Sequence, residues 1–114
     1  MKIRFVNTFR GGAFIWILLL SAYLTSCAED GSRGDPGAGK TKVTACVACH
    51  GADGNPANPD LPALAGQEWH YLVDAMKAYQ DGRRSDPTMT HLLETLTEDD
   101  LEDIAAFYAS QQAK

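Results

Sequence analysis

Two cysteines and a histidine stand together in the segment Cys46-Val-Ala-Cys49-His50. If the segment is helical, about one turn separates the cysteines, and both thiols lie along one edge, where they can form thioethers with the two vinyl groups of a porphyrin. The next side chain, His50, can then bind the porphyrin iron as an axial ligand. The spacing therefore predicts one haem c, attached covalently through Cys46 and Cys49 and bound at its iron by His50.

Paired cysteines have three other common uses: a dithiol redox centre, a zinc site and a structural disulfide. A dithiol centre is expected after a strand in a βαβ unit, and a zinc site needs a second pair of ligands. A disulfide gives no role to the adjacent His50. The sequence offers no support for any of the three, so haem attachment is the favoured interpretation.

A further side chain is needed to bind the iron on the face opposite the histidine. Met76 has the helical spacing of the apolar residues before it and fits a packed core, whereas His70 lies off that apolar stripe. Met89 lies in a polar segment, residues 83–91, that we expect to be a loop, where an apolar side chain needs a reason to be present. We predict Met89 as the second iron ligand, with His91 as the alternative.

The elements that must position these residues are helices, because apolar residues recur at helical spacing and convincing strand alternation is not found. One helix is expected over about 98–111, where Thr97 can cap the first turn and an apolar stripe follows at Leu101, Ile104, Ala105 and Tyr108. Others are expected over about 67–80 and 39–49. Residues 51–66, rich in proline and glycine, should form a structured loop. The fold class is all-α.

Length and charge limit the function classes. The chain has 114 residues, 45% of them hydrophobic, and a formal net charge of −5, which fits one globular domain and excludes a disordered chain or a basic nucleic-acid binder. Residues 28–114 hold 7 basic against 15 acidic side chains, a charge of −8. A helical domain of about 75 residues buries only about 60% of its unfolded surface and usually needs an additional stabilising element. A haem in the core would supply it.

The N-terminal segment has the organisation of an export signal. Lys2, Arg4 and Arg10 precede an apolar run of roughly a dozen residues, shorter than the ~20 that a membrane-spanning helix needs. The run leads into Leu24-Thr25-Ser26-Cys27, which resembles the lipobox of bacterial lipoproteins, in which the cysteine receives a diacylglycerol thioether before cleavage. The alternatives are an ordinary signal peptide with a chance cysteine and an uncleaved anchor.

The predicted organisation has three parts. Residues 1–26 form a lipoprotein signal peptide, and residues 27–38 comprise the lipidated Cys27 and a flexible, glycine-rich tether. Residues 39–114 form the haem domain. This organisation predicts a periplasmic bacterial protein that acyl chains hold on a membrane surface.

Three segments carry a family resemblance: Cys46-Val-Ala-Cys-His-Gly-Ala-Asp-Gly54, Leu61-Pro-Ala-Leu-Ala-Gly-Gln67 and Leu101-Glu-Asp-Ile-Ala-Ala-Phe-Tyr108. With them, the chain from Gly39 to Gln111 resembles the small monohaem class I c-type cytochromes of bacteria and is similar to single domains of the dihaem kind. The resemblance implies a small helical domain wrapped around one covalently attached haem with one edge exposed.

The resemblance also implies roles for particular residues. The first and last helices should cross at Gly39, against Ile104, Phe107 or Tyr108. The carbonyl of Pro62 should accept a hydrogen bond from the outer nitrogen of the axial histidine, which would fix the ring and raise its basicity.

Two further roles concern the second iron ligand and the haem propionates. Met89 matches the family's methionine position. Tyr71, Arg83 and Arg84 are candidate partners for the haem propionates, although each can equally be a surface residue.

The predicted function is transfer of single electrons, because iron with histidine and methionine ligands has no open position for dioxygen or a substrate. We therefore expect a monomeric carrier with transient redox protein partners, not an enzyme, and no nucleic-acid partner. Two alternatives are a haem subunit of a larger dehydrogenase or oxidase, and a gas-binding or peroxidatic haem protein if the sixth position is open.

Overall fold

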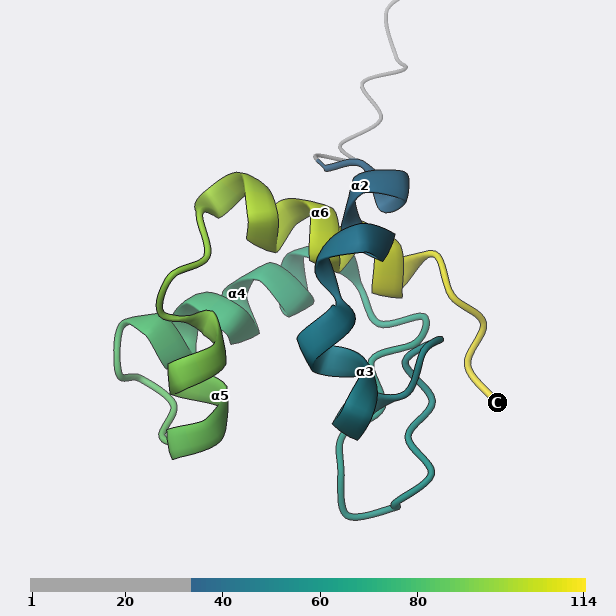
Figure 1. Cartoon of the computed structure of the whole chain (residues 1–114), viewed down its shortest axis with the longest axis horizontal. Helices are drawn as coiled ribbons and strands as arrows, with labels where there is room; N and C mark the ends of the chain where they lie inside the picture. Colours follow the sequence, from purple (N-terminus) through teal and green to yellow (C-terminus); the bar gives the residue numbers. More distant parts are fainter. Residues whose placement is uncertain (1–33) are drawn as a thin grey trace, which may run out of the picture. The chain divides into compact units, whose positions relative to one another are not determined.

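The computed structural model describes residues 34–114, which form five helices and no strands within that range (Figure 1). The all-α prediction is therefore confirmed for this part of the chain. The predicted signal peptide, the lipobox with Cys27 and the first part of the predicted tether lie outside the described residues. None of the helices in residues 34–114 has the length and hydrophobicity to span a membrane.

The first predicted helix is two short helices, α2 (Pro36–Lys42) and α3 (Thr44–His50), which meet at Val43. Helix α2 begins three residues before the predicted start, because Pro36 occupies its first turn and the Asp35 side chain accepts a hydrogen bond from the Gly37 backbone N–H at 2.7 Å. Residues 36–38 are thus helical, and their assignment to a flexible tether was wrong.

Helix α2 crosses α6 (Glu98–Ala109), and Gly39 lies at the crossing. A Cβ atom at position 39 would lie 2.0 Å from the Asp103 carbonyl oxygen and 2.8 Å from the Phe107 Cβ. Only glycine allows the two backbones to approach this closely. The crossing that the resemblance implied is present, with Phe107 against the glycine.

Replacement of Gly39 by alanine is expected to lower the free energy of unfolding by roughly 1–3 kcal/mol, because the added methyl group must push α2 away from α6. Chemical denaturation followed by circular dichroism measures this loss. Gly37→Ala is the matched control in the same helix, since its Cβ would meet no atom closer than the Asp35 Oδ1 at 3.1 Å. Equal stability of the two variants would show that the crossing tolerates a side chain.

Helices α6 and α4 (Trp69–Gln80) supply most of the core. In α6, the Thr97 hydroxyl accepts from the Asp100 backbone N–H and the Asp100 side chain accepts from the Thr97 backbone N–H, a capping box that fixes the helix start. The predicted apolar stripe of α6 is buried, and all of it except Leu101 belongs to one core cluster with residues of α4 and with Val43. The members of this cluster are Val43, Leu72, Val73, Ile104, Ala105, Phe107 and Tyr108.

Helix α5 (Pro87–Leu93) was not predicted, since we expected a polar loop over residues 83–91. The Asp86 side chain accepts a hydrogen bond from the Met89 backbone N–H at 2.9 Å, and Pro87 occupies the first turn. Asp followed by Pro is a helix-start signal as well as a turn signal, and here it begins a helix. Helix α5 packs on α4.

Candidate functional site

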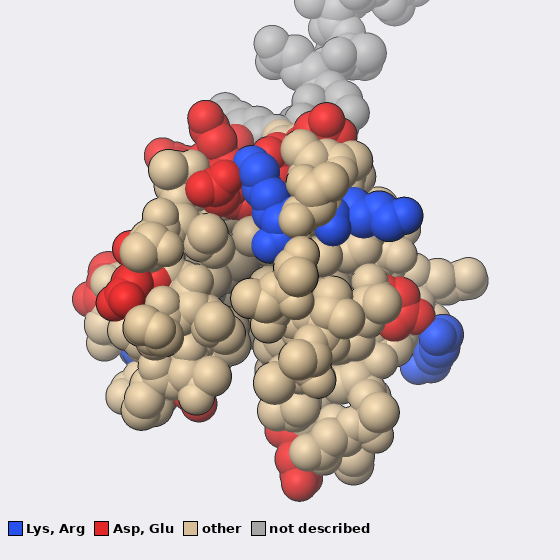
Figure 2. Space-filling model, viewed as in Figure 1, with Lys and Arg blue, Asp and Glu red and all other residues tan. Residues whose placement is uncertain are grey.

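A cleft lies between α3 and α5, with an empty volume of about 540 Å³ that includes its open mouth. Figure 2 shows it as a hollow between the two halves of the described domain, with uncharged side chains on both sides. Its lining residues are Lys42, Ala45, Cys46, Cys49, His50, Thr88, Met89, Leu92, Leu93 and Leu96.

Helix α3 brings both cysteines of the motif to the cleft. Both have free thiols; Cys46 is half-buried and Cys49 is exposed. Burial raises the pKa of the Cys46 thiol. Within residues 34–114, no three His, Cys, Asp or Glu side chains are arranged to hold a metal ion, so the zinc-site alternative has no second ligand pair there.

His50 is the last residue of α3 and is buried, with 6% of its surface exposed. Its Nδ1 lies 2.9 Å from the carbonyl oxygen of Pro62. A carbonyl oxygen can only accept, so Nδ1 donates and Nε2 keeps a lone pair. The contact that the resemblance implied is present, and it leaves His50 in the tautomer that can bind a metal through Nε2.

The loop that carries Pro62 is held against the core by backbone contacts. Leu64 and Ala65 both donate from their backbone N–H groups to the Gly54 carbonyl, at 2.8 and 3.1 Å. Gly54 has φ +76°, and a Cβ there would lie 2.8 Å from the Tyr108 ring. The loop therefore packs directly on α6, which fixes the carbonyl that orients His50.

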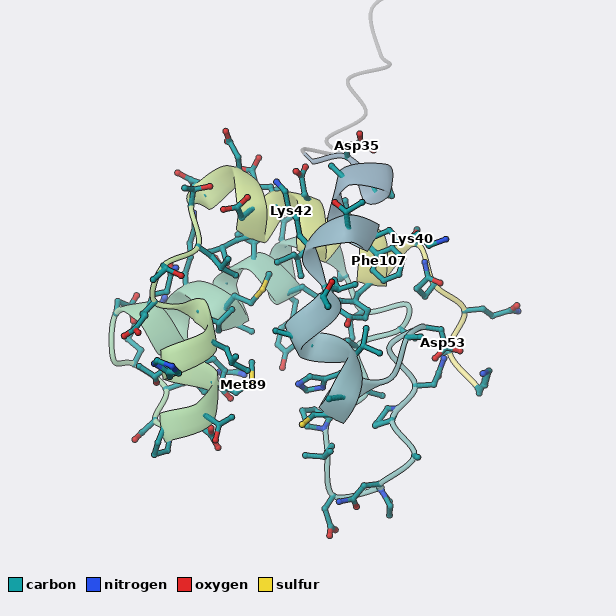
Figure 3. The ribbon with its side chains drawn as sticks, viewed as in Figure 1. Asp35, Lys40, Lys42, Asp53, Met89 and Phe107 are labelled. Atoms are coloured by element: carbon teal, nitrogen blue, oxygen red, sulfur yellow. The ribbon has the colours of Figure 1, made fainter. Side chains whose placement is uncertain are left out.

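Met89 is half-buried in α5, and its side chain lines the cleft. Figure 3 shows it on the side of α5 that faces α3. Met76 packs against the core cluster from α4 and does not line the cleft, as its helical spacing predicted.

The two other histidines that could be ligands point elsewhere. His70 is exposed, with its ring 4.6 Å from that of Trp69. The His91 side chain is 81% exposed and lies 3.0 Å from Glu94. Of the four candidate ligands, the structure brings Met89 alone to the cleft that holds His50.

The three candidate propionate partners do not line the cleft. Arg83 forms an ion pair with Asp81 at 2.8 Å. Arg84 donates to the Tyr71 hydroxyl at 3.4 Å and lies over the Tyr71 and Tyr79 rings. The structure thus groups Tyr71 with Arg84, outside the lining of the cleft.

Lys42 lines the cleft although sequence reasoning did not select it. It precedes Cys46 by four residues, a spacing that can place two side chains on one helical face. Lys42 and Cys46 lie in different helices, because α2 ends and α3 begins at Val43, so helical spacing alone did not relate them.

The residues of the cleft fit a haem. Two free thiols are available for thioethers, the imidazole of His50 presents a free Nε2, and the thioether of Met89 can bind iron. The walls at Leu92 and Leu93 are apolar, as a flat macrocycle requires.

Comparison with known proteins supports the same reading. The model of the family "Cytochrome c" matches residues 37–112. The chain is 48% identical over 95 residues to a cytochrome c4 of Pseudomonas aeruginosa, and the aligned region covers 83% of this chain and 46% of the relative. It is 45% identical over 82 residues to cytochrome c-554(548) of Halomonas halodenitrificans, covering 69% of this chain and 99% of the relative.

A solved structure agrees with the sequence relatives. The crystal structure of reduced recombinant cytochrome c4 from Pseudomonas stutzeri superimposes with a TM-score of 0.66 at 42% identity, covering 69% of this chain and 46% of that one. The chain thus spans about half the length of the cytochrome c4 relatives that it matches. The chain belongs to the cytochrome c family, and its cofactor is a covalently bound haem c.

Proposed function

We propose that this protein is a single-electron carrier whose haem is attached through Cys46 and Cys49 and whose iron lies between His50 and Met89. The observation that carries the proposal is the cleft itself, which is lined by all four of these side chains. They come from two helices, α3 and α5, that face each other across the cleft.

Each residue has a distinct part in this account. The two thiols anchor the cofactor along α3, and the Pro62 carbonyl holds the His50 ring at a fixed angle with Nε2 free. Met89 would bind the iron from α5, and Leu92 and Leu93 would provide apolar wall beside the macrocycle. The haem would supply a one-electron iron couple, and a methionine ligand would raise its reduction potential.

An iron with two protein ligands has no open position, which favours a carrier over gas binding or peroxidatic chemistry. Within residues 34–114 the large hydrophobic side chains that are exposed are Tyr71 on α4 and Leu92 on α5. Two such side chains do not make the broad apolar face of a permanent subunit. We therefore propose a monomer that meets redox protein partners transiently.

Direct electrochemistry of the purified protein tests the carrier proposal. We expect one reversible couple that transfers one electron per polypeptide, in which the oxidation and reduction waves share one midpoint potential. An irreversible wave, or a catalytic current on addition of peroxide, would contradict a carrier and support the enzyme alternative.

The place of action is also a proposal. The charged and apolar N-terminal residues followed by Cys27 support export to the periplasm and lipid anchoring there. A lipid anchor joined to the domain by a short linker would keep the carrier near membrane partners.

Cys27→Ser is expected to release the protein from membranes without a change in its haem spectrum, because anchor and haem site are separate modules. Fractionation of expressing cells with haem staining measures this. Staining that stays in the membrane pellet would indicate an uncleaved apolar anchor. Unmodified protein in the soluble fraction would remove the lipid anchor from the account.

A further inference from the structure

One charged side chain lines the otherwise uncharged cleft. The stem of Lys42 forms part of the wall beside Cys46, and its ammonium group leaves the cleft toward α6. There its Nζ lies 2.8 Å from an Asp100 carboxylate oxygen and 2.6 Å from an Asp103 carboxylate oxygen. Lys42 thus connects the edge of the cleft with the start of α6.

The three groups are held in place from several directions. The Asp100 carboxylate also accepts from the Thr97 backbone N–H at 3.0 Å, and Asp103 accepts from the Asp35 backbone N–H at 2.7 Å. All three side chains are mostly buried: the exposed fraction is 31% for Lys42, 27% for Asp100 and 16% for Asp103. The hydrogen bond with Lys42 lowers the pKa of Asp100 to about 2 and also lowers that of Asp103. Both carboxylates are therefore charged at neutral pH.

From this arrangement we infer that Lys42 sets the reduction potential of the redox centre by neutralising one of the two carboxylate charges beside the cleft. The inference rests on the proposed carrier function. One-electron reduction adds one negative charge inside the cleft, so nearby negative charge disfavours it and nearby positive charge favours it. With Lys42 in place the cluster has a charge of −1, and without it the same two carboxylates would have a charge of −2.

The neighbouring Lys40 provides a matched control in the same helix. Lys40 is exposed, does not line the cleft and forms no ion pair within residues 34–114. Figure 3 shows the two lysines on different sides of α2. Lys40→Met and Lys42→Met remove the same charge, and only the second uncovers paired carboxylates.

The test is the equilibrium constant for reduction by a soluble one-electron mediator, measured at neutral pH for the haem-loaded protein. A unit charge roughly 10 Å from the redox centre changes such a constant about 2- to 15-fold for effective dielectric constants between about 80 and 20. We expect Lys42→Met to lower the constant within that range and Lys40→Met to change it less than twofold. Lys42→Arg keeps the charge and should retain the value of the unmodified protein.

Changes at Asp103 separate charge from shape. Asp103→Asn alone should raise the constant, and Lys42→Met with Asp103→Asn should bring it back toward the unmodified value, because the net charge of the cluster returns to −1. Asp103 is chosen because Asp100 also belongs to the capping box of α6. A merely structural Lys42 would give no such recovery.

Two results would overturn the inference. If Lys40→Met and Lys42→Met have equal equilibrium constants for reduction and the one-electron couple is intact, the role of Lys42 is rejected. The carrier proposal would then still stand. Absence of a one-electron couple in the unmodified protein would reject the carrier proposal and this inference with it.

Discussion

Replacement of both Cys46 and Cys49 by alanine is expected to abolish covalent haem and to remove most of the helical signal of the protein. The described domain is small, and its cleft separates α3 from α5. Helix α5 packs on α4 and makes no comparable contact with α2, α3 or α6. Without a group that fills the cleft, the seven-residue helices α3 and α5 have too little apolar contact to stay folded. Helix α4 then loses its contact with α5 and the core loses the side chains of α3, and a domain of this size has little other packing to keep α4 and α6 folded.

Far-ultraviolet circular dichroism and haem staining of the double variant measure both effects together. Cys27→Ser is the control, since it removes a cysteine outside the described domain and should preserve stain and helix alike. A haem-free protein with native helical signal would contradict the view that the haem stabilises this fold.

Met89→Ala is expected to open the sixth position of the iron. The ferric spectrum should lose its weak sulfur-to-iron absorption near the red end, the reduction potential should fall, and the ferrous protein should gain carbon monoxide binding. These three changes share one cause, the loss of the thioether that α5 presents to the cleft.

Met76→Ala is the matched control, because Met76 packs against the core cluster from α4. It should cost roughly 2–5 kcal/mol of stability through the cavity that it leaves, with the ligand spectrum unchanged. If Met76→Ala removes the sulfur-to-iron band and Met89→Ala retains it, Met89 is not the ligand.

The sequence allowed prediction of the elements whose signals are local. Helix α6 carries its own cap at Thr97 and a full apolar stripe, and its start at Glu98 matches the predicted position. Helix α4 ends at Gln80 as predicted and starts two residues after the predicted Gln67, because Glu68 provides the cap. Both are twelve residues long, enough for the period of 3.6 to be visible.

Two features were missed, helix α5 and the break between α2 and α3. Helices α2, α3 and α5 each have seven residues, fewer than two full apolar repeats, so periodicity could not define their boundaries. The signals that were present, Asp35-Pro36 and Asp86-Pro87, are shared by turns and helix starts. Contact with α6 and α4 decides between the two, and such long-range contacts are not visible in a local window.

The site divides in the same way. The motif around Cys46 and the Pro62 contact followed from spacing and from the family resemblance. The role of Lys42 could not be predicted from the sequence, because its ion-pair partners are about sixty residues away on α6. These ion pairs form only because α2 crosses that helix closely. Tyr71 and Arg84 were selected by residue type, and they contact each other outside the cleft lining.

The most direct test of the carrier account is the visible spectrum of the ferrous protein before and after carbon monoxide is added. If His50 and Met89 both bind the iron, no position is open, and the spectrum should stay unchanged. An immediate carbon monoxide shift in freshly purified, unmodified protein would show an open sixth position. That result would contradict the carrier account and favour a gas-binding or peroxidatic protein.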